Sequence, residues 1–343
     1  MFKKTIILLL TPFLVYSQEN INFSKTIIIE DLERHLNILA SDSLEGRETG
    51  KKGQKMAADY IMNHFKNIGI PPYKKKTYYQ KFKVKSRKHL CKCDDCDQSL
   101  VKKIFGNKKK IKGSNILGYI EGTDLKEELV IITAHYDHLG KHDSLIFNGA
   151  DDDGSGTVAA LEIAEAFMLA KKAGNGPRRS VLIMPVSGEE KGLLGSKYYT
   201  DHPIYPLEKT VANLNIDMIG RIGDFKDNPN YVYLIGSDML SKELHDISEE
   251  VNKKHIGLEL DYTFNKEDDP NRYYYRSDHY NFAKNNIPVI FYFNGIHEDY
   301  HKTTDTVEKI DFKKIETITR LVFLTAWELV NREERIVVDK KED

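Results

Sequence analysis

Acidic side chains and histidines stand where several apolar runs in the middle of the chain come to an end. His135 and Asp137 directly follow the apolar run at residues 129–133. The others lie after similar runs or in a loop that precedes a helix: Asp151, Asp152, Asp153, Glu189, Glu190, Asp217 and His301. Imidazole nitrogens and carboxylate oxygens without thiolate are a ligand set that suits zinc, with manganese or cobalt as substitutes.

The apolar runs alternate with amphipathic segments, and this pattern predicts the elements that position these side chains. We expect strands at residues 129–133, 181–186, 211–216, 231–235 and 288–293, and helices at 56–68, 156–169, 193–199, 240–255 and 312–330. Continuous apolar strands separated by helices are typical of a sheet that is covered on both faces. We therefore predict an α/β fold with a mixed, mostly parallel twisted sheet between helices. In such sheets ligands bind beyond the carboxyl ends of the strands.

The number of candidate ligands indicates two metal ions. A catalytic zinc ion takes three protein ligands and keeps one position open. Two ions about 3.5–4 Å apart can share one carboxylate. Five segments that each supply one ligand then suffice for both ions if one aspartate bridges them.

Two neighbouring acids are candidates for supporting roles. Asp137 is two residues from His135, so in extended chain it faces the same way and could accept the second ring N–H or otherwise order the ligand shell. One carboxylate of the pair Glu189 and Glu190 could bind metal while the other acts as general base. The same pair also suits an ordinary helix start. Four other histidines are expected to be ordinary core or surface residues: His138, His142, His202 and His255.

Two short motifs point to other kinds of hydrolase. Residues 297–301 read HEDYH and match the HExxH zinc motif, but that motif requires a helix and this segment is flanked by loop-like sequence. Ser277, Asp278 and His279 are adjacent and cannot form a serine triad by themselves, and the chain has no GxSxG motif. We expect neither chemistry.

Composition and the termini of the sequence bear on location. The 343 residues include 51 Lys and Arg against 52 Asp and Glu, a balance that disfavours nucleic-acid or anionic-membrane binding. Lys3 and Lys4 precede an apolar stretch at residues 5–16, which predicts a signal peptide at residues 1–17. No later segment is apolar enough to cross a membrane. We expect one periplasmic or extracellular catalytic domain at residues 19–343, without stable membrane insertion.

An insert near residues 86–112 interrupts the otherwise regular pattern. It holds the three cysteines of the chain, Cys91, Cys93 and Cys96, close to His89. An odd number cannot pair completely, so either one disulfide and a free thiol or a small Cys/His metal site is expected. The lysine-rich stretch at residues 102–112 is predicted to be an exposed loop.

Six segments taken together resemble family twenty-eight of the metallopeptidases, the co-catalytic zinc aminopeptidases to which glutaminyl cyclases are related. The segments are 134–140 (AHYDHLG), 148–156 (NGADDDGSG), 187–196 (SGEEKGLLGS), 215–220 (NIDMIG), 277–279 (SDH) and 301–305 (HKTTD). Residues 43–47 (SLEGR) also resemble the N-terminal part of such proteins. The resemblance covers about residues 32–330 apart from the insert.

The resemblance implies a role for each matching residue. Asp152 would bridge two zinc ions, His135 and Asp217 would complete one site, and Glu190 and His301 the other. Glu189 would be the general base for a metal-bridging hydroxide, and the peptide after Asp152 would be cis. Arg276 stands where some members have a tyrosine that stabilises the oxyanion, so it could replace that residue or bind a substrate carboxylate.

The implied activity is that of a secreted aminopeptidase with two Zn²⁺ per chain and peptide substrates. A glutaminyl cyclase-like acyltransferase, and a carboxypeptidase or dipeptidase of the same fold, are the alternatives. Candidate lining residues for the side-chain pocket, which equally suit ordinary packing, are Tyr273, Tyr274, Tyr275, Tyr292, Phe293 and Tyr300. Residue preference and oligomeric state are left open.

Overall fold

The computed structural model describes residues 23–85, 110–266 and 268–340. The predicted signal peptide, the cysteine cluster and most of the insert near residues 86–112 lie outside the described residues. In the described part, no helix is both long and apolar enough to span a bilayer.

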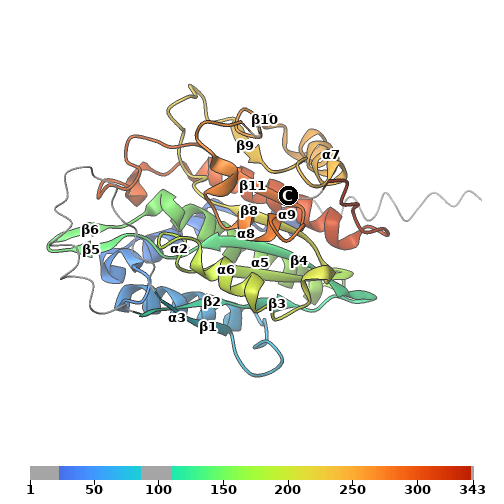
Figure 1. Cartoon of the computed structure of the whole chain (residues 1–343), viewed down its shortest axis with the longest axis horizontal. Coiled ribbons are helices and arrows are strands. Elements are labelled where there is room, and N and C mark those ends of the chain that lie inside the picture. The colour runs from blue at the N-terminus through green and yellow to red at the C-terminus, as the bar shows by residue number, and fades with distance from the viewer. Residues whose placement is uncertain (1–22, 86–109, 267, 341–343) are drawn as a thin grey trace, which may run out of the picture.

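A seven-stranded sheet runs through the middle of the molecule, in the order β10-β9-β11-β8-β4-β7-β3 (Figure 1). Its strands are β3 (Gly118–Ile120), β4 (Leu125–His135), β7 (Arg179–Val186), β8 (Thr210–Ile216), β9 (Tyr231–Ile235), β10 (Glu259–Asp261) and β11 (Val289–Phe293). The pairs β4–β7, β4–β8, β8–β11 and β9–β10 are parallel, whereas β9–β11 and β3–β7 are antiparallel. The predicted mixed, mostly parallel sheet is confirmed.

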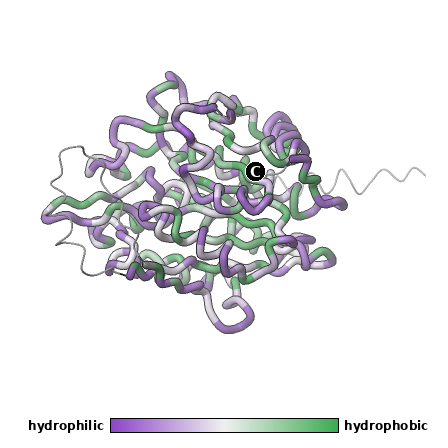
Figure 2. The backbone as a smooth tube through the Cα atoms, viewed as in Figure 1, coloured by the Kyte–Doolittle hydropathy of each residue, from purple (hydrophilic) through white to green (hydrophobic). Residues whose placement is uncertain are grey.

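Helices cover both faces of this sheet, as predicted. They are α2 (Ile29–Leu39), α3 (Lys52–Asn67), α5 (Gly156–Lys172), α6 (Leu194–Asp201), α7 (Lys242–Val251), α8 (His279–Ala283) and α9 (Phe312–Asn331). Alternate side chains of a strand point to opposite faces. Val130 and Ile132 of β4 therefore pack in one core with α2, α3, α5, α7 and α9, while Leu129 and Ile131 pack in a second core with α6 and α8. Figure 2 shows the hydrophobic segments gathered in the central strands.

Two hairpins lie beside the central sheet. β1 (Tyr79–Lys85) pairs antiparallel with β2 (Lys110–Ile116), and β5 (Gly140–His142) pairs with β6 (Leu145–Phe147). The exposed loop predicted at residues 102–112 is wrong for its last three residues, because Lys110, Ile111 and Lys112 pair with β1 and begin strand β2. These residues form a strand because they pair with β1 across the insert. Pairing with a distant segment cannot be predicted from the local lysine content.

Candidate metal centre and active site

The predicted ligands lie at one edge of the sheet because four parallel strands end there. His135 is the last residue of β4, and Asp217 directly follows β8. Glu189 and Glu190 follow β7, and His301 lies in the segment after β11. Asp152 belongs to residues 150–155, which connect the β5–β6 hairpin to α5. The fold thus delivers side chains that are up to 166 residues apart to one rim.

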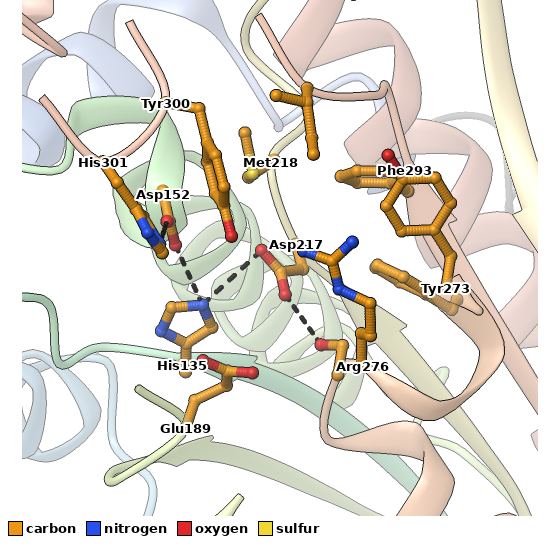
Figure 3. A pocket seen from close by; sticks show the side chains of 13 residues that line it. His135, Asp152, Glu189, Asp217, Met218, Tyr273, Arg276, Phe293, Tyr300 and His301 are labelled. Atoms are coloured by element: carbon orange, nitrogen blue, oxygen red, sulfur yellow. Dashed lines mark hydrogen bonds and ion pairs between the residues drawn. The ribbon is translucent and has the colours of Figure 1, made fainter. Parts of the chain in front are cut away.

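Asp152 lies between the two histidines of this cluster (Figure 3). Its Oδ1 is 3.2 Å from Nε2 of His135, and its Oδ2 is 3.0 Å from Nε2 of His301. Nε2 of His135 is also 3.5 Å from Oδ1 of Asp217, and Nε2 of His301 is 3.6 Å from Oε2 of Glu190. One carboxylate oxygen directed at each half of the cluster is the arrangement that a bridging ligand requires.

The loop that carries Asp152 is held by buried backbone hydrogen bonds to acidic side chains. The carboxylate of Asp305 accepts the N–H groups of Asp151 and Asp152 at 3.0–3.2 Å. Asp153 accepts the N–H groups of His135 at 2.9 Å and Met218 at 3.2 Å, and so joins β4 to the end of β8. The peptide between Asp152 and Asp153 is cis, as the resemblance implied.

Of the two roles predicted for Asp137, its contacts favour ordering of the neighbouring groups over acceptance of the His135 ring N–H by its carboxylate. The acceptor for Nδ1 of His135 is the backbone carbonyl of Asp137, at 3.0 Å, while the Asp137 carboxylate is 4.0 Å from that nitrogen. That carboxylate is engaged elsewhere, because it accepts the Thr49 hydroxyl at 2.5 Å and the N–H of Glu189 at 3.3 Å. Asp137 therefore orders His135 through its main chain and Glu189 through its side chain.

His138 belongs to the cluster, although the sequence analysis placed it among ordinary histidines. It is fully buried, with Nδ1 2.9 Å from Oε1 of Glu190 and 3.8 Å from Oδ2 of Asp152. Burial lowers the pKa of His138 to about 4, so the ring is neutral at neutral pH. Its nearness to His135 in sequence was the available signal, but the direction of its side chain depends on the turn that follows β4. His142 and His202 are exposed, as expected.

The HExxH and Ser-Asp-His segments have structural roles. Residues 297–301 form turns and no helix, and Nε2 of His297 lies 3.2 Å from Asp151 instead of facing the cluster. The Ser277 hydroxyl donates to Oδ2 of Asp217 at 2.7 Å, and His279 stacks on the ring of Phe291. Neither a single-zinc helix nor a serine triad is formed by these residues.

Acidic groups are concentrated at the site, and their pKa values are shifted. Burial raises the pKa of Glu189 well above its ordinary value, and burial together with Asp152 raises the pKa of Glu190 to about 8. Although burial opposes it, the carboxylates of Asp217 and Asp152 raise the pKa of His135 well above its ordinary value. Oε1 of Glu190 is buried and lies 2.9 Å from Nδ1 of His138, but it has no hydrogen bond of suitable geometry among the described residues. Such a set of nitrogen and oxygen donors with excess carboxylate fits divalent cations.

A pocket opens beside the cluster, and only some of the predicted aromatic residues line it. For the residues on β11, the alternation of side chains along the strand decides which of them face the pocket. Tyr273, Phe293 and Tyr300 line the pocket, together with the unpredicted Met218, Phe291 and Ile296. Tyr292 packs in the core on the opposite face of the sheet, and Tyr274 and Tyr275 are not part of the lining. Arg276 and Glu189 also line this pocket, as Figure 3 shows.

An α/β sheet with imidazoles and carboxylates converging at its carboxyl edge is typical of metal-dependent hydrolases. Residues 115–326 match the profile of peptidase family M28. That match covers more than half of the chain, and the chain belongs to this family of metallopeptidases.

Individual relatives agree with the family. The probable leucine aminopeptidase of Arthroderma otae is 28% identical over 291 residues, which cover 80% of this chain and 74% of the relative. The vacuolar membrane protease of Aspergillus niger is 34% identical over 117 residues, or 30% of this chain and only 11% of that much longer protein. Among solved structures, the LapA aminopeptidase of Legionella pneumophila matches 97% of this chain and 79% of its own, at 20% identity and a TM-score of 0.66. The glutaminyl cyclase of Porphyromonas gingivalis matches 87% of this chain and 97% of its own, at 17% identity and a TM-score of 0.62.

Proposed function

We propose that the chain is an exported aminopeptidase that holds two zinc ions and removes N-terminal residues from peptides. In this proposal His135 and Asp217 would hold one ion, Glu190 and His301 would hold the other, and both ions would share Asp152. The observation that carries this proposal is the position of the Asp152 carboxylate, with one oxygen 3.2 Å from His135 and the other 3.0 Å from His301.

The donors suit zinc and not a simple network of hydrogen bonds. Two imidazoles and three carboxylates supply five donors at one rim, and Oε1 of Glu190 has no hydrogen bond of suitable geometry among the described residues. Asp153 is also near His135 and Asp217. Its oxygens, however, already accept backbone N–H groups from His135, Gly156 and Met218, so we assign it to positioning.

Glu189 is the general base in this proposal. Zinc ions bound at such a site polarise the scissile carbonyl and make the attacking water more acidic. Glu189 takes the proton of that water and returns it to the leaving amine. Its raised pKa suits a group that must both accept and release a proton, and the hydrogen bond from its N–H to Asp137 fixes its main chain.

An aminopeptidase is favoured over the alternatives by the names of several relatives, among them the A. otae protein and LapA. A glutaminyl cyclase-like acyltransferase uses the same fold, and a carboxypeptidase or dipeptidase would share the metal centre. All five proposed ligands and Glu189 are present, whereas loss of one of them would point to the cyclase or to a non-catalytic relative.

One experiment separates these reactions. The zinc-loaded protein is incubated with one peptide sequence in two forms, acetylated at the N-terminus or amidated at the C-terminus. An aminopeptidase cleaves the first residue from the amidated form and leaves the acetylated form intact. The reverse pattern would establish a carboxypeptidase, and conversion of an N-terminal glutamine to pyroglutamate, with loss of ammonia and no cleavage of a peptide bond, would establish the cyclase. N-terminal sequencing of the exported protein tests the proposed cleavage after Ser17.

A further inference from the structure

Arg276 places a cationic group in the pocket beside the metal centre. It caps the short helix at Tyr273–Tyr275 and directly precedes Ser277, whose hydroxyl binds Asp217. Figure 3 shows its guanidinium turned into the pocket, between Asp217 and the aromatic rings. The guanidinium carbon lies 4.9 Å from the centroid of the Tyr273 ring. The ring supports the planar group from one side and leaves its N–H edge directed at the pocket.

Several cations of the described chain have carboxylate partners, whereas Arg276 has none among the described residues. Arg221 binds Asp299 at 3.0 Å, Lys309 binds the same carboxylate at 2.6 Å, and Lys191 lies 3.4 Å from Glu48. No carboxylate of the described chain comes within 4.0 Å of the Arg276 guanidinium. Apart from its contact with the Tyr273 side chain, the guanidinium is thus available to a carboxylate that enters the pocket.

The apolar part of the pocket wall leaves the guanidinium able to bind an ionic group. Met218, Phe291, Phe293 and Ile296 offer its N–H groups no strong acceptor, while the polar part of the lining includes the acidic residues of the metal centre. Arg276 is itself exposed, but an ion pair near a protein surface is still stronger than one in bulk water. Arginine presents paired N–H groups that match the two oxygens of a carboxylate.

We propose that Arg276 binds a carboxylate of the substrate. This inference rests on the proposed peptidase function and names its substrate class. The carboxylate has two possible sources: an acidic side chain on the N-terminal residue, or the C-terminus of a dipeptide. We assign stabilisation of the oxyanion to the metal centre and to Tyr300. Figure 3 shows the Tyr300 hydroxyl on the Asp217 side of the pocket.

The test uses two matched pairs of substrates and two variants. The aminoacyl amides of glutamate and glutamine, each carrying the same fluorogenic leaving group, differ only in the charge of the side chain. The dipeptide Leu-Gly and its C-terminal amide differ only in the terminal carboxylate. The Arg276→Gln variant removes the guanidinium. Arg272→Gln is the control, because Arg272 lies over the ring of Tyr275 and does not line the pocket.

The proposal predicts a selective change in kcat/KM. Arg276→Gln lowers the preference for the charged member of one pair about tenfold or more, while Arg272→Gln leaves both preferences unchanged. The pair that responds identifies the source of the carboxylate, and Arg276→Lys restores only part of the preference. An equal loss on all four substrates would overturn the proposal in favour of an oxyanion role, and unchanged preferences would also overturn it.

A binding measurement separates failure of this inference from failure of the proposed function. If the zinc-loaded protein cleaves none of the four compounds, the proposed function fails. Calorimetric titration with the four compounds then decides the inference. Tighter binding of a charged member that is lost in Arg276→Gln supports the carboxylate site, and equal binding of charged and neutral members contradicts it.

Discussion

Replacement of Arg47 by methionine tests whether the metal-site loops are held from outside the sheet. Arg47 is only 1% exposed and lies in the segment between α2 and α3. Its guanidinium donates to four backbone carbonyls: Tyr136 at 2.8 Å, Leu39 at 2.7 Å, Asn148 at 2.6 Å and Gly149 at 2.9 Å. Tyr136 follows the proposed ligand His135, and Gly149 precedes the loop that carries Asp152.

The expected loss follows from those four acceptors. A buried acceptor left without a partner costs about 1–3 kcal/mol. Four such acceptors give at least about 4 kcal/mol, while removal of the buried charge, whose pKa burial lowers, relieves part of this penalty. We expect the free energy of unfolding to fall by about 3–5 kcal/mol, within the range that removal of one buried ionic partner produces.

Urea unfolding followed by fluorescence measures this loss, because the single tryptophan, Trp327, is buried and should report it. Arg34→Met is the matched control: Arg34 is exposed on α2 and, among the described residues, its ion pair is with Asp31, so its loss should cost less than about 1 kcal/mol. If the two variants unfold with free energies within about 0.5 kcal/mol of each other, the tethering role of Arg47 is refuted.

Three further predictions concern the site and one buried cluster. Glu189→Gln should lower kcat by about 10²–10⁴-fold with zinc still bound, as shown by activity and metal analysis; retained activity would remove Glu189 as the base. His138→Ala should weaken zinc binding about 10–100-fold in a chelator competition, because Glu190 loses the group beside Oε1; unchanged affinity would make His138 a bystander. Burial raises the pKa of Glu162 to about 8, so this carboxyl is protonated in the fold and its stabilising contribution is lost as pH rises from about 4.5 through 8. The free energy of unfolding of Glu162→Gln, relative to that of the unchanged protein, should therefore be higher at pH 8 than at pH 5. The same difference between the two proteins at both pH values would disprove the pKa shift.

The convergence of the candidate ligands could be predicted from sequence because their spacing follows the strand ends. Apolar runs located β4, β7, β8 and β11, and the topology of a parallel sheet then required His135, Glu190 and Asp217 to meet at one edge. The same logic located the general-base candidate Glu189.

Side-chain direction outside the regular elements could not be predicted in this way. His138 and Asp137 lie in the turn after β4, where no fixed period relates sequence position to direction. The two-residue rule therefore identified the right neighbour of His135 but the wrong acceptor atom. The role of Arg47 in holding these loops could likewise not be predicted, because its four acceptors are carbonyls from segments up to 102 residues away.

The zinc content of the protein tests the central claim most directly. It should be measured after zinc loading and dialysis in a variant with Cys91, Cys93 and Cys96 replaced by serine, so that no thiolate contributes. Two zinc ions per chain are predicted, with both affinities strongly weakened by Asp152→Ala because that carboxylate serves both ions. One ion or none in the cysteine-free protein, or two ions held undiminished after Asp152→Ala, would contradict a bridged pair of metals.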